Sequence, residues 1–258
     1  MSRSEPRLFI PPAQRLHTGA EIALDPAQAH YLGAVMRQQA GAGLTLFNGR
    51  DGEWHATLAD MRKKGATAQV ETCLRPQPPQ GAAPGVPEGP ELLFSPLKRD
   101  ATETVIRMGT ELGVSRFRPV VCARTNTHRL NLERLALIAI EASEQCERLT
   151  VPPIMPLEPL TVVLARWPRR RTLAVALERE GGSPALVAAD ALLIGPEGGF
   201  APEERARMMA MDFVRPLSLG ALVLRADTAV ASGLARLEAA QANQVTSGQS
   251  DCQPAVLG

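Results

Sequence analysis

The chain has 258 residues, 45% of them hydrophobic and 21% charged, which is typical of a soluble globular protein long enough for two domains. Only 3% of the residues are aromatic, which argues against base stacking on many exposed rings as a main mode of binding. The formal net charge is only +1, so binding of nucleic acid would have to depend on local basic clusters. Residues 62–64 and 169–171 form such clusters, but a solvated surface explains each of them equally well.

Residues 1–75 are predicted to form a small β-rich domain. Asp25, followed by proline, predicts the capped start of a short helix. The apolar stretches 44–47 and 54–58 flank Asn48–Gly52, and the Asn-Gly and Asp-Gly pairs of this loop favour the positive φ angles of a hairpin turn. Such a β domain could be a structural cap or a module that docks on RNA.

A linker over residues 76–90 is the clearest domain boundary. Prolines, which lack a backbone donor, alternate there with glycines, which weaken regular structure. Residues 91–245 then alternate between strand-like and helix-like segments, which predicts a second, α/β domain with a largely parallel sheet. The polar residues 246–258 are predicted to form a flexible tail.

The segments of this second domain follow from apolar patterns and terminal residues. The strand candidates are 92–94, 117–121, 173–177, 191–194 and 213–217. The helix candidates run from Asp100 to Gly113, from Asn131 to about Arg148, from Pro202 to Met211 and from Ala229 to Ala242. Asp100 with Glu103 predicts the cap of the first helix, and Asn131 predicts that of the second.

Several kinds of site are unsupported by the sequence. The four cysteines, Cys73, Cys122, Cys146 and Cys252, form no CxxC pair and have no histidine at zinc-ligand spacing, so reduced thiols and no metal site are expected. The nucleotide-binding and hydrolase motifs GxGxxG, GxSxG and HExxH and the P-loop pattern do not occur. No signal-peptide core and no apolar run long enough for a membrane is seen, so a cytoplasmic protein is expected.

Two glycine-bearing stretches, Leu193–Phe200 and Leu217–Thr228, each join an apolar, strand-like segment to a turn and then to a helix-like segment. This layout predicts two adjacent loops at one end of the sheet, where backbone groups can meet a ligand. Because few catalytic side chains accompany these loops, the pattern favours a reaction in which a cofactor supplies the reactivity and the protein supplies positioning.

The two loops resemble the paired cofactor loops of the SPOUT methyltransferases. This likeness rests on Gly195–Phe200 with Glu203 and Glu204, and on the pattern Leu219-Gly220-x-x-Val223-Leu224-Arg225-x-Asp227-Thr228-Ala229. Further stretches are similar to the family of ribosomal RNA small subunit methyltransferase E. They are Glu111–Val114 with Pro119 and Arg124, Glu141–Arg148 with Val151 and Pro152, and, in the PUA-like domain of that family, Arg7-x-Phe9 and His30–Arg37.

This resemblance, which runs from about Arg7 to Gln241, implies a fold and an activity. The fold would be a PUA-like, RNA-binding β-barrel domain over 1–75 and a SPOUT-type α/β trefoil-knot domain with a parallel sheet over 91–245, paired in a homodimer. The activity would be transfer of a methyl group from S-adenosylmethionine (SAM) to N3 of a uridine in 16S ribosomal RNA, either free or in the assembled small subunit.

The resemblance also implies which residues form the site. Candidates for cofactor binding are Leu177, Glu178, Gly195, Glu197, Gly198, Gly199, Leu219, Gly220 and Leu224, although a tight turn or a core position explains several of them equally well. Candidates for RNA contacts are Arg7, Arg37, Arg124, Asn126 and Arg148, with solvated surface residues as the alternative. Glu197 is expected to order its loop through hydrogen bonds to the backbone.

Arg225 and Asp227 are the catalytic candidates. A uridine N3 is protonated at neutral pH, so its methylation requires loss of a proton and stabilisation of the negative charge that develops. Arg225 could hold that charge, and Asp227 could accept the proton or orient Arg225. An Arg–Asp ion pair that stabilises the loop is the alternative.

Three positions depart from the family pattern. Met108 and Leu222 stand where the family usually carries Lys and Arg, and Asp227 stands where it carries Glu. These departures leave a second hypothesis open, a noncatalytic RNA-binding or ribosome-assembly protein that keeps the fold. The helix over 229–242, rich in small residues, could pack against a second copy or within its own domain.

Overall fold

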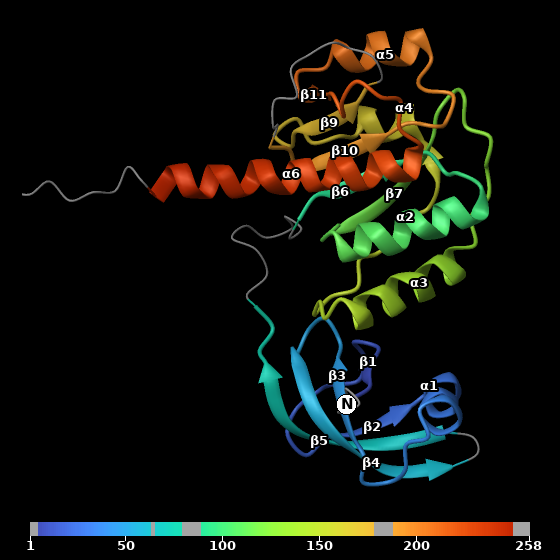
Figure 1. Cartoon of the computed structure of the whole chain (residues 1–258), viewed down its shortest axis with the longest axis vertical. Helices are drawn as coiled ribbons and strands as arrows, with labels where there is room; N and C mark the ends of the chain where they lie inside the picture. Colours follow the sequence, from blue (N-terminus) through green and yellow to red (C-terminus); the bar gives the residue numbers. More distant parts are fainter. Residues whose placement is uncertain (1–4, 63–64, 79–88, 178–187, 250–258) are drawn as a thin grey trace, which may run out of the picture. The chain divides into compact units, whose positions relative to one another are not determined.

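The structure, a computed structural model, describes residues 5–62, 65–78, 89–177 and 188–249 (Figure 1). The chain divides into two compact units. Unit 1 comprises Met1–Pro84 and Ile140–Val151, and unit 2 comprises Gly85–Ala139 and Pro152–Gly258. Residues 79–88 of the predicted linker lie outside the described residues, and the domain boundaries drawn from the sequence stay predictions.

Unit 1 contains a strongly curved, five-stranded sheet in the order β1-β3-β4-β5-β2 (Figure 1). Its elements are β1 (Arg7–Phe9), β2 (Glu21–Leu24), α1 (Pro26–His30), η1 (Tyr31–Val35), β3 (Gly43–Phe47), β4 (Glu53–Arg62) and β5 (Gly65–Arg75). The predicted hairpin is confirmed, because β3 and β4 pair antiparallel and Gly49 and Gly52 between them have φ angles of 73° and 89°. The predicted cap of α1 is also confirmed, since the Asp25 carboxylate accepts from the Gln28 backbone N–H.

Unit 2 is an α/β unit with a six-stranded, entirely parallel sheet in the order β11-β9-β10-β6-β7-β8. The strands are β6 (Glu91–Phe94), β7 (Arg116–Val121), β8 (Glu158–Pro159), β9 (Leu173–Ala176), β10 (Ala191–Ile194) and β11 (Val214–Leu217). The helices are α2 (Arg99–Glu111), α4 (Leu160–Ala165), α5 (Pro202–Met209) and α6 (Ala226–Gln249), together with the first part of α3 (Leu132–Gln145), whose residues from Ile140 belong to unit 1. This arrangement confirms the predicted fold class, although β8 and α4 were not foreseen.

The ends of three helices differ in part from the sequence prediction. Asp100 lies inside the first turn of α2 rather than at its cap, which is Lys98 with no side-chain bond, so the predicted Asp100 cap is wrong. Asn131 does cap α3, because its Oδ1 accepts from the Arg134 N–H at 3.0 Å, but the helix ends at Gln145, shortly before residue 147 with its φ of 58°. α6 runs to Gln249, so the first residues of the predicted tail are helical, and 250–258 lie outside the described residues.

α6 packs against β10 and α2 within unit 2 (Figure 1). A Cβ added at Gly233 would lie 2.7 Å from the Leu192 side chain, so this small residue lets the helix approach the sheet closely. Val230, Leu234 and Leu237 are also buried on the same helix. The small residues of α6 therefore serve packing within the unit, which was one of the two explanations considered from the sequence.

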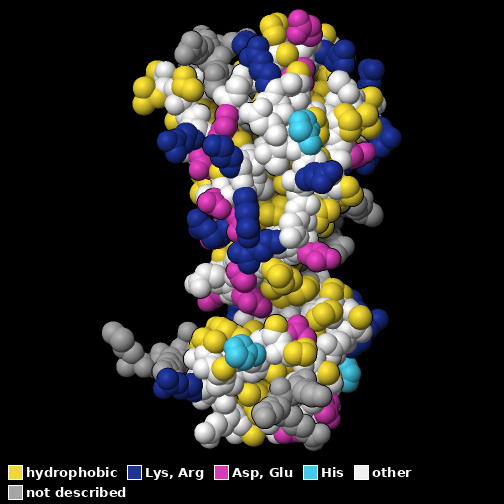
Figure 2. Space-filling model, turned by 90° about the vertical axis from the view of Figure 1, so that its right-hand side faces the viewer, with side chains coloured by type: hydrophobic (Ala, Val, Ile, Leu, Met, Phe, Trp, Pro, Cys, Tyr) yellow, Lys and Arg dark blue, Asp and Glu magenta, His cyan; other side chains and the backbone are white. Residues whose placement is uncertain are grey.

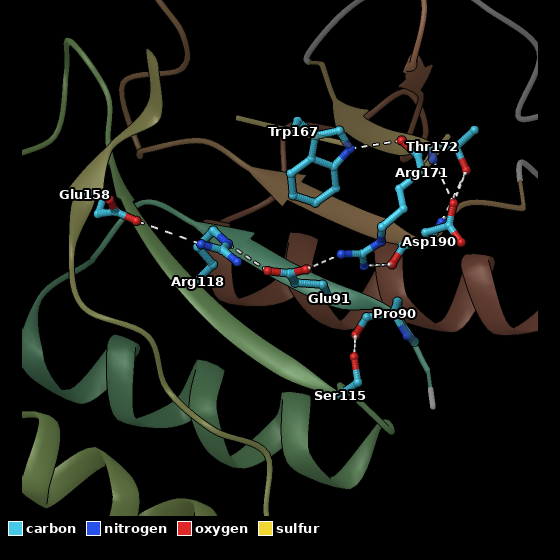
Figure 3. A network of polar contacts seen from close by, with 9 residues as sticks. All are labelled: Pro90, Glu91, Ser115, Arg118, Glu158, Trp167, Arg171, Thr172 and Asp190. Atoms are coloured by element: carbon cyan, nitrogen blue, oxygen red, sulfur yellow. Dashed lines mark hydrogen bonds and ion pairs between the residues drawn. The ribbon is translucent and has the colours of Figure 1, made fainter. Parts of the chain in front are cut away.

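An ion-pair network built on Glu91 lies where the strands of unit 2 begin (Figure 3). The Glu91 side chain is 0% exposed, and its carboxylate accepts from Arg118 Nε and Arg171 Nη1, each at 2.7 Å. Arg171 also lies over the Trp167 ring and donates to the Asp190 carbonyl. Because both carboxylate oxygens are satisfied, a buried charge is tolerated at the first residue of a central strand.

Among the helices of the described residues, none has the length and apolarity needed to cross a membrane. On the face shown in Figure 2, Lys and Arg side chains lie among Asp and Glu side chains rather than in one large basic field. A cationic binding site on this face would therefore be local.

Candidate functional site

A pocket of about 840 Å³ lies at the carboxyl-terminal edge of the parallel sheet in unit 2. β9 leads into it through Ala176 and Leu177, β10 through Ile194 and Gly195, and the segment after β11 through Leu219. Ligands of open α/β sheets bind at this edge, because the loops that leave adjacent parallel strands meet there. The two glycine loops of the sequence prediction thus line one pocket.

The pocket unites the predicted cofactor-binding residues of the described chain. Those that line it are Leu177, Gly195, Glu197, Gly198, Gly199, Leu219, Gly220 and Leu224. Glu178, which was predicted with them, lies outside the described residues. Arg225 and Arg124 line the same pocket, and Lys98, Asp100 and Arg205, which were not foreseen, also line it.

The surroundings of the three glycines in the first loop differ, and so does the physical reason for a glycine at each position. A Cβ at Gly195 would lie 2.9 Å from the Phe200 ring, so the ring itself requires glycine there. Gly199 has a φ of +68°, and its N–H donates to the Pro196 carbonyl at 2.8 Å to close a tight turn. A Cβ at Gly198 would make only ordinary contact, at 3.6 Å, with Arg124. No neighbouring atom of the described chain therefore requires glycine at 198.

Glu204, and not Glu197, orders the first loop. One carboxylate oxygen of Glu204 accepts from the Ala123 N–H at 2.8 Å and the other from the Ala201 N–H at 3.0 Å. Glu197 is exposed and its side chain makes no hydrogen bond within the described part of the chain. Arg124 adds a second brace by donating to the Gly198 carbonyl at 2.8 Å. The position of Glu204 as the third residue of α5 was the sequence signal for this role.

The second loop is held in place by hydrogen bonds from α6, the helix that follows it. Gly220 has a φ of +121°, a conformation that side chains rarely adopt, and the Arg236 guanidinium donates to the Ser218 and Leu219 carbonyls, each at 3.3 Å. Leu222 is 80% exposed. The loop is thus fixed at its base by α6 and presents an apolar side chain to the outside.

The two catalytic candidates occupy different surroundings. Arg225 is exposed and lines the pocket, and its carbonyl accepts from the Ala229 N–H at 2.8 Å in the first turn of α6. Asp227 does not line the pocket, and its Oδ1 accepts from the Thr228 N–H at 2.7 Å. In the described residues no ion pair joins Arg225 to Asp227, so the structure does not support the alternative explanation of these two residues as a loop-stabilising pair. The carboxylate that does line the pocket beside Arg225 and Glu197 is Asp100.

The pocket is positively charged overall. Four cationic side chains, from Lys98, Arg124, Arg205 and Arg225, line it together with the carboxylates of Asp100 and Glu197. An anionic ligand such as a nucleotide with its phosphates would therefore be attracted to it. Among the described residues, no group of His, Cys, Asp or Glu side chains is arranged to hold a metal ion.

A buried polar cluster lies between the ends of β6 and β7. The hydroxyls of Ser95 and Thr125 are 2.6 Å apart, and Thr125 accepts from the Cys122 N–H at 2.8 Å. Burial, with a smaller contribution from the Glu204 carboxylate, raises the pKa of the Cys122 thiol to about 12. The thiol therefore stays neutral and is no nucleophile at physiological pH.

Comparison with known proteins gives the family. A family model described as an RNA methyltransferase domain matches residues 87–238, and one described as an RNA methyltransferase PUA domain matches residues 24–71. A ribosomal RNA small subunit methyltransferase E of Synechocystis is 34% identical over 246 residues, which cover 90% of this chain and 77% of that protein. The protein of the same name from Rickettsia conorii is 29% identical over 237 residues, covering 90% and 94%.

The chain belongs to the ribosomal RNA small subunit methyltransferase E family. Solved structures agree with this placement. The structure of that methyltransferase from Neisseria gonorrhoeae, bound to SAM, superposes with a TM-score of 0.74 at 26% identity and covers 94% of this chain and 98% of that one. A Legionella pneumophila protein described as a methyltransferase, also with bound SAM, gives a TM-score of 0.77 at 26% identity over 92% and 98%. The family and the fold class predicted from the sequence are confirmed.

Within this family member, the predicted RNA-contacting residues fall into both units. Arg37 is exposed in unit 1, and Arg124 and Asn126 are exposed in unit 2. Arg7 is different, because its side chain is only 10% exposed, pairs with Glu53 at 2.6 Å and lies 3.8 Å from the centre of the Phe47 ring.

Arg7 also ties together the two stretches of chain that make up unit 1. Its Nη1 donates to the Ser143 carbonyl and its Nη2 to the Arg148 carbonyl, each at 2.8 Å. Arg148 in turn donates to the Thr150 hydroxyl at 3.4 Å. These contacts give the guanidinium of Arg7 partners within the protein, so RNA is not needed to explain its position. Contact of Arg7 or Arg148 with RNA stays a prediction.

Proposed function

We propose that this chain transfers a methyl group from SAM to N3 of a uridine in 16S ribosomal RNA of the small subunit. The observation that carries the proposal is the pocket that both glycine loops line at the carboxyl edge of the sheet. Two structural relatives of the same fold, at 26% identity, were crystallised with SAM. Curated relatives are named for methylation of small-subunit ribosomal RNA. Because ribosomal RNA is the proposed substrate, we propose that the protein acts in the cytoplasm.

The residues present fit the cofactor. Leu177 and Leu224 supply apolar contacts, and the backbone of Leu219 and Gly220 supplies donors and acceptors for an adenine. Gly198 leaves room that a Cβ would fill, at a position where nothing else in the described chain requires glycine. When bound, SAM supplies an electrophilic methyl group, and the protein has to supply position and electrostatics.

The chain supplies a cation for the charge that develops on the uracil. Removal of the N3 proton leaves negative charge on the adjacent carbonyl oxygens, and Arg225 lies in the pocket where it can stabilise that charge. Of the two aspartates, Asp100 lines the pocket whereas Asp227 binds the N–H of its own helix start. We therefore assign proton acceptance to Asp100 and leave Asp227 the role of ordering the loop around Arg225.

The PUA-like unit and a second copy of the chain complete the proposal. Arg37, Arg124 and Asn126 are exposed and available for RNA. The trefoil knot and the homodimer of the family are proposed for this chain as well. The exposed Leu222 and Val223, 80% and 55% accessible beside the pocket, are suited to be covered by the second copy. A monomeric mass in light scattering at micromolar concentration would contradict that part.

Two measurements on the wild-type chain test the function. Calorimetry should detect SAM binding, and incubation with SAM and small subunits from a strain lacking the corresponding gene should add one methyl group to one uridine, located by mass spectrometry of the RNA. Absence of SAM binding would overturn the proposal. Binding of RNA without methyl transfer would instead support the noncatalytic protein that Met108, Leu222 and Asp227 left open.

Replacement of Gly199 by Ala should weaken SAM binding about tenfold. At a φ of +68°, a residue with a Cβ costs about 1–2 kcal/mol; a loop that leaves this turn in the free protein has to regain it to bind SAM, and 1.4 kcal/mol then corresponds to about a factor of ten in affinity. Gly41→Ala is the matched control, because Gly41 has a φ of +89° in unit 1 and, like Gly199, no atom within 4 Å of a Cβ. Equal SAM affinities for the two variants in calorimetry would refute a role of the turn in binding.

The two aspartates are distinguished by their Asn variants. Asp100→Asn should lower the methyl-transfer rate by about 100-fold or more, the usual contribution of a general base. Asp227→Asn should cost less than about tenfold, since Asn can still accept from the Thr228 N–H. Single-turnover rates across pH check this order, and the reverse order would return the proton acceptor to Asp227.

A further inference from the structure

A second pocket, of about 320 Å³, adjoins the first in unit 2. One segment of the chain contributes to both pockets: Lys98 and Asp100 line the first pocket, and Leu97 and Arg99, alternating with them along the chain, line the second. Since consecutive Cα atoms are only about 3.8 Å apart, the two pockets are close enough for neighbouring nucleotides of one RNA strand to reach both.

The floor of this second pocket is apolar and firmly held. Leu97 and Leu135 are 6% and 4% exposed. The hydroxyls of Thr102 and Thr127 both donate to the Leu97 carbonyl, at 3.1 and 3.0 Å, which joins α2 and the segment before α3 to the same residue. Such a rigid apolar surface suits the face of a base or a ribose.

The rim of the pocket is cationic. Arg99, Arg129 and Arg134 line it together with one carboxylate, that of Glu103. Glu103 pairs with Arg99 at 3.0 Å and with Arg134 at 3.2 Å, which fixes both guanidinium groups at the rim. The exposed side chain of Arg129 makes no hydrogen bond or ion pair within the described residues, so its donors are available to a ligand.

We propose that this second pocket binds the nucleotide next to the methylated uridine, with its phosphodiester on Arg129 and its sugar or base on the leucine floor. A phosphodiester is the anion that a planar guanidinium recognises with two parallel hydrogen bonds. Arg99 and Arg134 add positive charge beside it. The inference rests on the proposed function for the identity of the RNA, but it assigns a site that lies outside the SAM pocket.

Arg129→Gln tests the site, with Arg107→Gln as the matched control. Arg107 is an exposed arginine of α2 that lines neither pocket and pairs with Glu111. Binding of labelled protein to unmodified small subunits is measured by fluorescence anisotropy at several KCl concentrations and constant magnesium. Arg129→Gln should weaken binding about tenfold and lower the slope of log K against log salt by about 0.7–0.9, the value for one phosphate contact. Arg107→Gln should leave both unchanged.

The affinity for SAM is the second readout. Because Arg129 is exposed and unpaired, its Gln variant should fold and bind SAM like the wild-type chain. A salt slope and affinity equal to those of Arg107→Gln would overturn the second pocket while leaving the methyltransferase proposal intact. Conversely, a chain that binds subunits through Arg129 but never methylates them would support this pocket and contradict the proposed function.

Discussion

Replacement of Arg225 by Ala is expected to lower the rate of methyl transfer about 100- to 1,000-fold. Removing one group that stabilises a developing oxyanion typically costs this much, because the site is arranged in advance for the charge of the transition state. Arg225 lines the pocket. Its backbone carbonyl, and not its side chain, accepts the hydrogen bond in the first turn of α6, so truncation of the side chain leaves the loop and the helix in place. Single-turnover kinetics with saturating SAM and unmodified small subunits measure the rate.

Two further variants make this result specific. Arg207→Ala removes an exposed arginine of α5 that does not line the pocket, and its rate should equal that of the wild-type chain. Arg225→Lys should keep part of the lost rate, because it retains the positive charge without the planar fork. The affinity for SAM should change less than about threefold in all three. A rate within tenfold of wild type for Arg225→Ala would remove Arg225 from the chemistry.

Replacement of Glu91 by Gln is expected to destabilise unit 2 by about 3 kcal/mol. Gln has nearly the same shape, but the change removes the charge between Arg118 and Arg171, whose side chains are 18% and 17% exposed, and replaces one accepting oxygen by an amide nitrogen that cannot accept (Figure 3). Loss of one partner from a buried ion pair costs about 3–5 kcal/mol because it leaves the other charge uncompensated, and the partial exposure of both arginines favours the lower end.

Urea unfolding followed by Trp167 fluorescence gives the free energy of unfolding of unit 2. Trp167 is 7% exposed and donates to the Arg171 carbonyl, so it reports on this network, and a Trp54→Phe background removes the other tryptophan of the chain. Glu111→Gln, in an exposed pair with Arg107, is the control and should cost at most about 1 kcal/mol. A loss below 1 kcal/mol for Glu91→Gln would show that water already screens the network.

The elements of the fold were largely readable from local patterns. The Asn-Gly turn at residue 48, the Asp25 cap and the apolar runs before the two loops each act over a few neighbours, so their structures follow from short-range sterics and hydrogen bonds. The short strand β8 and helix α4 were missed, because two and six residues are too few for a periodic pattern. Asp100 was misread as a cap, since the Asp-x-x-Glu pattern does not exclude a helix start two residues earlier.

The sequence predicted the residues of the candidate site only where they are consecutive in the chain. The loop glycines and Arg225 stand in two continuous motifs and were predicted together. Lys98 and Asp100 reach the pocket from another element, so nothing in their own neighbourhood marks them as site residues, whereas the place of Glu204 in the first turn of α5 was a signal for its role.

The sequence by itself determined the two classes of domain, the two glycine loops and the family, because each depends on residues close together in the chain. Only the tertiary structure decided that Asp100 and not Asp227 lines the pocket, that Arg7 is enclosed rather than exposed, and that a second, arginine-rimmed pocket is lined by the same segment as the first. The physical reason is that a parallel sheet brings the ends of strands far apart in sequence to one edge. Contacts of this kind arise from the packing of residues that are far apart in the sequence, so a pattern over neighbouring residues does not predict them.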